Sequence, residues 1–185
     1  LALEEQIGAG DGALRLVANG VHCLHHARFS KPDRELLDQA IESRFGKSAP
    51  VRGGAIAITT QTVQQSLDLD ADFMLTDLAP MDVLLQRFGR LHRHRERDPD
   101  RPTAFGVARA VVMTGDEPLD TCLRANGEAR GSHGAGTVYS DLVVLEATRQ
   151  RLAQSGELRI PEQNRELVEV TTHPDALRAL VSALG

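Results

Sequence analysis

The sequence TTQTVQQSLDLDADFMLTDLAPMDVLLQRFGRLHRH, residues 59–94, decides the fold class of this chain. A short aliphatic run precedes it, a second one lies inside it at Phe73–Thr76, and its last segment contains arginines. The order strand, polar turn, strand and helix is typical of open α/β sheets, which bind ligands beyond the carboxyl ends of their strands. This order within about 35 residues is a stronger signal than the composition of any one element.

The segment QRFGRLHR, residues 86–93, is expected to continue a helix that Pro80 opens. At about 100° per residue, Gln86, Arg90 and Arg93 fall within roughly 60° of one another on the helix. The opposite side is apolar and consists of Met81, Leu84, Leu85, Phe88 and Leu91. One face could then pack on a core while the other presents two guanidiniums, which suit phosphate oxygens. An amphipathic helix with a solvated basic face is the simpler alternative.

The aliphatic runs predict the other elements of the chain. Strands are expected at Val21–His25, Ala55–Ile58, Phe73–Thr76 and Gly106–Met113. Helices are expected at Lys31–Phe45, 80–93, Val138–Gln154, Pro161–Glu169 and Pro174–Leu184. Strands that alternate with helices predict a three-layer α/β fold, a parallel sheet with flanking helices, and strands buried on both faces. An interruption of regular secondary structure is expected at Asp98–Pro102 and a long loop or insertion at Thr114–Gly136.

Composition limits the possible functions. The 185 residues are 41% hydrophobic and 25% charged, as in a globular domain with a core, and 3% aromatic, which argues against base stacking as the main nucleic-acid contact. The formal net charge of -5 means that any phosphate-binding surface must be local, with Arg87 to Arg97 as the candidate. Cys23 and Cys122 are too few for a disulfide framework or zinc site. No signal peptide or membrane span appears, so a cytoplasmic location is expected.

Several tempting motifs are incomplete. A phosphate-binding P-loop needs glycine five residues before its Gly-Lys-Ser, but residue 41 before Gly46-Lys47-Ser48 is isoleucine, so that tripeptide is interpreted as a helix end. Asp116-Glu117 follows a strand in a way that only weakly suggests a metal-holding pair. His22 and His26 would share a strand face, but no carboxylate or cysteine stands at ligand spacing. We therefore predict no metal site in this chain.

A resemblance to one family rests on segments spread along the chain. These are LHHARF at 24–29 with Asp33-Arg34, the stretch 59–94, Val138-Tyr139, Ile160-Pro161 and Arg165–Glu169. Together they resemble the CRISPR-associated helicase-nuclease of type I systems, over roughly residues 20 to 170. The stretch 59–94 is similar to motifs V and VI of superfamily 2 helicases, which the second RecA-like lobe carries. The resemblance implies a RecA-like lobe of P-loop NTPase type at 1–136, lacking its N-terminal part, and a helical C-terminal extension or linker at 137–185.

The resemblance also implies roles around a bound nucleotide. Arg93 would act as the arginine finger on ATP, Arg90 would contact the γ-phosphate, and Gln86 would help to place the attacking water. Asp68 would reach the ribose, although on composition alone both Asp68 and Asp70 could either meet a ribose hydroxyl or order their loop. A finger of this kind neutralises charge that develops on phosphoryl oxygens.

Other positions match the nucleic-acid track of the family. Thr60, with Gln61 beside it, would contact the nucleic-acid backbone, and His25 and Arg28 would lie near the path of the nucleic-acid strand. Gln64 departs from the family, which commonly has glutamate there, so no role is assigned to it. Hydroxyls and amides of this kind contact phosphates without selecting bases.

As a whole, the resemblance implies half of a motor. ATP would be the cofactor, with Mg²⁺ held by a first RecA-like lobe elsewhere in a longer protein, and single-stranded DNA would be unwound and fed to a nuclease domain. A guide-RNA surveillance complex would be the further partner, and no membrane is expected. The isolated chain is predicted to be inactive. An RNA helicase, a restriction-type translocase and a non-catalytic scaffold of the same fold remain alternatives.

Overall fold

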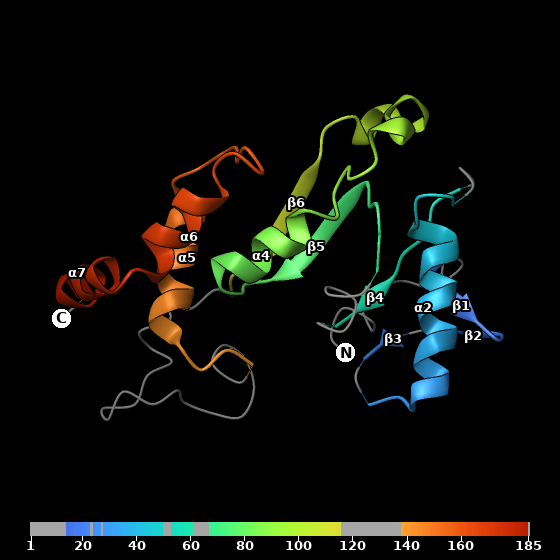
Figure 1. Ribbon diagram of the computed structural model, residues 1–185, viewed down its shortest axis with the longest axis horizontal. Coiled ribbons are helices and arrows are strands. Elements are labelled where there is room, and N and C mark those ends of the chain that lie inside the picture. The colour runs from blue at the N-terminus through green and yellow to red at the C-terminus, as the bar shows by residue number, and fades with distance from the viewer. Residues whose placement is uncertain are drawn as a thin grey trace. The chain divides into compact units, whose positions relative to one another are not determined.

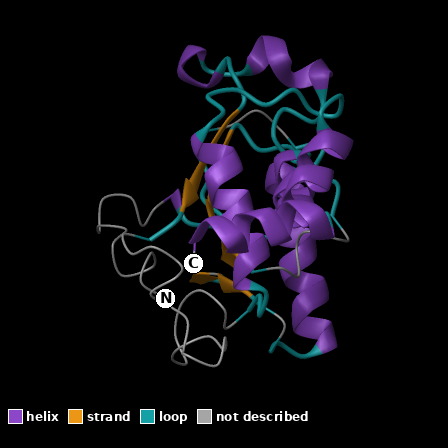
Figure 2. Cartoon of the chain, turned by 90° about the vertical axis from the view of Figure 1, so that its left-hand side faces the viewer, coloured by secondary structure: helices purple, strands orange, loops and turns teal. Residues whose placement is uncertain are grey.

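The computed structural model describes residues 14–22, 24–26, 28–49, 53–60, 67–115 and 138–184 (Figure 1). Its residues fall into two compact units: unit 1 comprises Leu1–Asp72 with Arg90–Ala108, and unit 2 comprises Phe73–Gly89 with Arg109–Gly185. The strands are short beside the helices (Figure 2). The boundary expected between residues 136 and 137 lies outside the described residues and stays a prediction.

The described part of unit 1 begins with a hairpin whose second strand lies within the strand expected at Val21–His25. Strands β1 (Val17–Ala18) and β2 (Val21–His22) pair antiparallel. The turn between them has φ of 51° at Asn19 and 77° at Gly20, as a two-residue hairpin turn requires. The Asn-Gly dipeptide was the sequence signal for this hairpin. The next strand, β3 (Leu24–His25), pairs in parallel with β4 (Ile58–Thr59).

Helix α2 (Lys31–Phe45) has the predicted bounds. Ser30 caps it by accepting a hydrogen bond from the N–H of Asp33. Leu37 and Ile41 are buried, whereas Leu36 is 45% exposed, so only part of the apolar side of this helix faces the core. The core of unit 1 consists of Leu16, Ile41, Leu67 and Leu69. The helix ends at Gly46, where a Cβ atom would lie 2.5 Å from the carbonyl oxygen of Glu42. Gly46-Lys47-Ser48 is therefore a helix end, as predicted.

Two short 3-10 helices occupy the part of unit 1 where an interruption of regular secondary structure was expected. They are η2 (Arg95–Asp100) and η3 (Thr103–Phe105). Pro99 lies inside η2, and the N–H of Arg101 donates to the carbonyl of Asp98 where η2 ends. The prolines therefore exclude an α-helix here but permit tight 3-10 turns.

Unit 2 contains the longest strand pair among the described residues. Strands β5 (Phe73–Asp77) and β6 (Arg109–Met113) pair in parallel along five residues each. Phe73 and Leu75 are 43% and 39% exposed, so the expectation of strands buried on both faces is wrong for this pair. The described strands form three separate two-stranded sheets, two of them parallel. The α/β content is as predicted, and the three-layer RecA-like sheet stays a prediction.

The helices of unit 2 form its core. They are α4 (Met81–Phe88), α5 (Leu142–Ala153), α6 (Asn164–Thr172) and α7 (Pro174–Leu184). Met81 and Leu85 of α4 pack with Leu167 of α6, and α7 contacts both α5 and α6. Helix α5 begins later than predicted because Asp141 caps it by accepting from the N–H groups of Val143 and Val144. The C-terminal helices thus share a core with the helix that precedes the arginines.

The shared core predicts the cost of one truncation. Leu167 is 0% exposed, so Leu167→Ala removes buried methyl groups between α4 and α6 and should cost about 2–5 kcal/mol in the free energy of unfolding. Urea unfolding checks this value. Val170→Ala is the matched control, since Val170 lies on the same helix but is 42% exposed, and it should change stability by about 0.5 kcal/mol or less. Equal losses for the two variants would contradict the assigned core.

Candidate functional site

The helix that precedes the arginines ends earlier than the sequence predicts. Helix α4 stops at Phe88, and the N–H of Gly89 donates to the carbonyl of Leu85 at 3.0 Å. The expectation that Gln86, Arg90 and Arg93 share one helical face is therefore wrong. Gln86 is an exposed residue of α4 in unit 2, whereas Arg90 and Arg93 belong to unit 1.

The segment after the helix pairs with Ala71 instead of continuing a helix. The N–H of Ala71 donates to the carbonyl of Arg90 at 2.8 Å, and the N–H of His92 donates to the carbonyl of Ala71 at 3.1 Å. These two bonds form a parallel bridge between Ala71 and Leu91. Pairing with a distant segment thus overrides the local helical pattern.

A left-handed residue separates the two arginines. His92 has a φ of 45°, a conformation that residues other than glycine rarely adopt. The next N–H, that of Arg93, donates to Oδ1 of Asp70 at 2.8 Å. Such backbone strain is typical of positions that the surrounding structure holds firmly.

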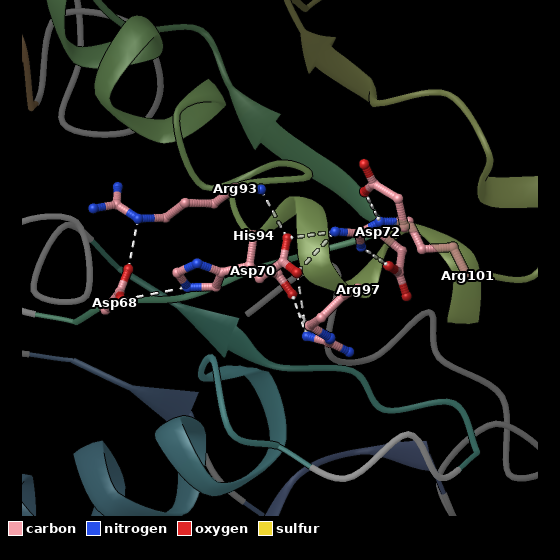
Figure 3. Close-up of polar contacts among 8 residues, drawn as sticks. Asp68, Asp70, Asp72, Arg93, His94, Arg97 and Arg101 are labelled. Carbon is pink, nitrogen blue, oxygen red and sulfur yellow. Dashed lines mark hydrogen bonds and ion pairs between the residues drawn. The ribbon is translucent and has the colours of Figure 1, made fainter.

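Asp70 is the centre of a charged cluster in unit 1 (Figure 3). Its side chain is 0% exposed. Nη2 of Arg101 lies 2.9 Å from Oδ1 and 2.8 Å from Oδ2 of Asp70, and Nη1 of Arg97 lies 3.4 Å from Oδ2. Arg97 also donates to the backbone carbonyl of Asp70 at 3.3 Å. A buried carboxylate needs such partners, because an unpaired buried charge is strongly destabilising.

Arg101 holds the far side of the same cluster. Its side chain is 3% exposed and contacts three carboxylates: Nη2 binds Asp70, Nη1 binds Asp72, and Nε donates to Asp98 at 3.0 Å. Burial by itself would lower the pKa of Arg101, but the hydrogen bonds to Asp98, Asp70 and Asp72 outweigh burial and raise that pKa. The guanidinium therefore stays charged and ties the end of η2 to residues 70–72.

The side chain of Arg93, unlike its backbone N–H, contacts an exposed carboxylate. Its Nε lies 2.5 Å from Oδ1 of Asp68, and Nε2 of His94 lies 3.3 Å from Oδ2 of Asp68 (Figure 3). Arg93 and Asp68 are 41% and 54% exposed. Exposed ion pairs are typically worth about 0.2–1 kcal/mol, so a competing anion could displace Asp68 at little cost.

Arg90 lies close enough to Arg93 for their charges to repel. Burial lowers the pKa of Arg90, and the positive charge of Arg93 lowers it further, while Asp68 opposes both effects. Two guanidiniums near one exposed carboxylate form a site that a phosphate group would stabilise. These residues therefore fit an anionic ligand such as a nucleotide.

Not every arginine of the segment Arg87–Arg97 faces solvent as a phosphate-binding surface. In unit 2, Nη1 of Arg87 donates to the hydroxyl of Thr76 at 2.6 Å and to the carbonyl of Asp77 at 3.2 Å, and Nη2 lies 3.2 Å from the hydroxyl of Tyr139. Arg97 is paired with the buried Asp70. The basic surface expected from the sequence is therefore smaller, because these two arginines bind internal partners.

Two of the predicted nucleic-acid residues, Thr60 and His25, meet at the ends of β3 and β4. The N–H of Thr60 donates to the carbonyl of His25 at 2.9 Å, as expected for residues at the carboxyl ends of adjacent parallel strands. The His25 side chain is 2% exposed, and its Nε2 lies 2.7 Å from Oδ1 of Asp38 on α2. Thr60 and Arg28 are exposed.

Some predicted features lie outside the described residues: Cys23, Gln61, Gln64, Asp116-Glu117 and Cys122. Among the residues that the structure describes, no group of three His, Cys, Asp or Glu side chains could hold a metal ion. Within the same residues, no helix has the length and apolarity needed to cross a membrane.

Comparisons with known proteins identify the family. The family model described as CRISPR-associated nuclease/helicase Cas3, C-terminal, matches residues 12–96. The Cas3 endonuclease/helicase of Thermus thermophilus is 40% identical over 147 residues, or 79% of this chain and 14% of the relative, and that of Escherichia coli is 35% identical over 148 residues, or 79% and 15%. The crystal structure of T. fusca Cas3 covers 100% of this chain and 20% of its own, with 30% identity and a TM-score of 0.74. This chain belongs to the Cas3 family.

Membership confirms the resemblance predicted from the sequence, and the Cas3 match of residues 12–96 includes Thr60, Asp68, Arg90 and Arg93. The chain spans about one seventh of the curated Cas3 relatives it matches. Similar solved structures include T. fusca Cas3 with ADP, with AMPPNP and with ATP, and a CRISPR RNA-guided surveillance complex in a pre-nicking state.

Sequence reasoning missed two residues of the charged cluster, Asp70 as its centre and Arg101 as its anchor. Asp70 was considered only as a group that could meet a ribose hydroxyl or order its loop, and Arg101 fell in a segment expected to interrupt the regular secondary structure. The run Asp68, Asp70, Asp72 with alternate residues acidic was a usable signal, since alternate residues of an extended segment share a face.

The pairing of His25 with Asp38 predicts a structural penalty. Asp38→Ala leaves a buried imidazole without its carboxylate and should cost about 1–3 kcal/mol in the free energy of unfolding. Thermal or urea unfolding checks the loss. Glu35→Ala serves as control, because Glu35 is an exposed residue of the same helix. If Asp38→Ala proved as mild as the control, the His25–Asp38 pair would not support the end of β3.

Proposed function

We propose that this chain is part of the second helicase lobe of an ATP-dependent single-stranded DNA translocase in type I CRISPR interference. In this role it supplies an arginine finger and part of the DNA track. The observation that carries the proposal is the adjacent pair of guanidiniums, Arg90 and Arg93, which repel each other beside the exposed carboxylate of Asp68. Cas3 structures with bound nucleotides among the relatives support this assignment.

The proposed division of roles follows the family resemblance, and the contacts of Arg93 and Asp68 in unit 1 support it. When bound, ATP with Mg²⁺ on the first lobe supplies a phosphoryl group for transfer to water. Arg93 exchanges Asp68 for the phosphates, Arg90 binds the γ-phosphate, and Asp68, once released, meets the ribose. Gln86 is proposed to orient water, a role that rests on the family resemblance alone. Arginines that bind only while the γ-phosphate is present would couple hydrolysis to opening of the cleft between lobes.

The DNA track is proposed to run past the carboxyl ends of β3 and β4. Thr60, exposed and fixed by its bond to the His25 carbonyl, would contact the phosphate backbone, with Gln61 beside it. Arg28 adds an exposed positive charge after β3. Because the imidazole of His25 is buried, we assign His25 to positioning Thr60 instead of direct contact with DNA.

The wider assembly is proposed from the relatives. A first RecA-like lobe and a nuclease domain would lie elsewhere in the same protein, and a guide-RNA surveillance complex would recruit it. Support comes from relatives named as nuclease and helicase in one protein and from the surveillance-complex structure.

The first test uses the intact parent protein with Arg93→Ala. DNA-stimulated ATP hydrolysis should fall by about 10³- to 10⁵-fold, or roughly 4–7 kcal/mol of transition-state stabilisation, because charge on the phosphoryl oxygens is no longer neutralised. Phosphate release with and without single-stranded DNA measures this. Arg165→Ala is the control, since Arg165 forms an exposed pair with Glu169 on α6 in unit 2, and it should hydrolyse ATP at the parental rate.

Two results would sink the proposal. If Arg93→Ala still hydrolyses ATP at the parental rate, Arg93 is not an arginine finger. If single-stranded DNA does not stimulate hydrolysis, the protein is not a DNA-driven motor. RNA that stimulates hydrolysis as well as DNA would instead reassign the substrate, since backbone contacts alone do not separate the two.

The second test uses the isolated 185-residue chain. It should neither hydrolyse ATP nor unwind DNA, because its sequence contains no P-loop to hold the triphosphate. Phosphate release and strand separation by the purified chain are the measurements. Turnover above the buffer background, undiminished by further purification, would refute this prediction.

A further inference from the structure

The carboxylate of Asp70 links a rigid part of unit 1 to the backbone of Arg93. The N–H of Asp70 donates to the carbonyl of Phe45 at 2.7 Å, and the neighbouring Leu69 forms an antiparallel bridge with Gly46. Leu69 itself belongs to the apolar core. Asp70 is therefore fixed through its backbone at the end of α2 and presents its side chain to the segment that carries the arginines.

Arg101 completes this link from the other side. It reaches back across 31 positions of sequence to bind both oxygens of Asp70, while Asp72 and Asp98 occupy its remaining nitrogens. Both ends of the segment from Arg93 to Arg101 thus bind the carboxylate of Asp70, and Arg97, between them, contacts the same carboxylate. The chain from Arg93 to Arg101 cannot shift without breaking a buried charged contact.

We propose that Asp70 and Arg101 are positioning residues for Arg93. The Asp70 carboxylate fixes the Arg93 backbone, Arg101 fixes that carboxylate, and the exposed Arg93 guanidinium can then move between Asp68 and a phosphate without moving its main chain. This inference rests on the proposed role of Arg93. Neither Asp70 nor Arg101 touches the nucleotide in this scheme.

The magnitude expected follows from the sensitivity of catalysis to position. A catalytic group displaced by about 1 Å can lose about 10²-fold in rate without leaving the site. A loosened Arg93 backbone should therefore lower kcat for ATP hydrolysis and leave the KM for ATP and single-stranded DNA binding nearly unchanged. A residue that served folding alone would lower the amount of active protein and would not act through Arg93.

The experiment is a double-mutant cycle in the intact parent protein. Arg101→Gln should lower kcat by about 10- to 10²-fold. In the Arg93→Ala background, measured under single-turnover conditions, Arg101→Gln should cost nothing further, because it acts through the removed side chain. Arg101→Lys, which restores the charge, should recover part of the rate. Arg165→Gln breaks an exposed pair of similar chemistry and should leave kcat unchanged in both backgrounds.

A second measurement does not depend on activity. Amide hydrogen exchange at Arg93 should accelerate in Arg101→Gln, while exchange in α2 stays at the parental rate. Asp98→Asn is a milder variant for the case that Arg101→Gln fails to fold, because the Asp98 side chain is 49% exposed and its carboxylate contacts Nε of Arg101. It should reproduce both effects in the same direction, by several-fold.

The outcomes separate this inference from the proposed function. If Arg93→Ala alone leaves hydrolysis intact, the proposed function fails. If Arg93→Ala abolishes stimulated hydrolysis but Arg101→Gln lowers the rate further in that background, the positioning role fails and the finger assignment stands. The same conclusion follows if Arg101→Gln alone leaves both kcat and amide exchange at Arg93 at their parental values.

Discussion

The organisation of unit 1 depends on one buried carboxylate. Asp70 has no exposed side-chain surface and is matched by Arg101, Arg97 and the N–H of Arg93. Removing one partner of a buried charged pair typically costs about 3–5 kcal/mol, because the charge left behind has no water to solvate it. The path of the backbone from Arg93 to Arg101 is therefore determined mainly by charged contacts with Asp70. Apolar packing contributes little, since η2 contains no buried residue.

The site combines a fixed main chain with an exchangeable side chain. Arg93 is held through its N–H by a group with no solvent access, whereas its guanidinium lies in an exposed pair with Asp68. Electrostatic catalysis benefits from groups that are already placed before the reaction, since no reorganisation then opposes it. The buried contact and the exposed contact thus serve different steps, one setting position and the other allowing ligand exchange.

The sequence predicted elements whose signals are local and missed those that depend on distant partners. The helices Lys31–Phe45 and Pro174–Leu184 have their predicted bounds, and strands were found at or near all four predicted positions, because capping residues and apolar periodicity act within a few residues. The helical wheel failed after Phe88 because Ala71 offers both its N–H and its carbonyl to the segment that follows. The pairing of Asp70 with Arg101 was invisible for the same reason, since 31 positions separate them.

The left-handed backbone at His92 limits what evolution or an engineer can place between the two arginines. At a φ of 45°, glycine meets no Cβ clash, whereas valine, isoleucine or threonine would press a branched Cβ against the neighbouring carbonyl. Size, charge and aromaticity at this position are thus secondary to tolerance of the left-handed region. At the position of His92, relatives and designed variants should therefore have one of a few residue types, including glycine, asparagine and histidine. This should hold even where the residues on either side remain arginine or leucine.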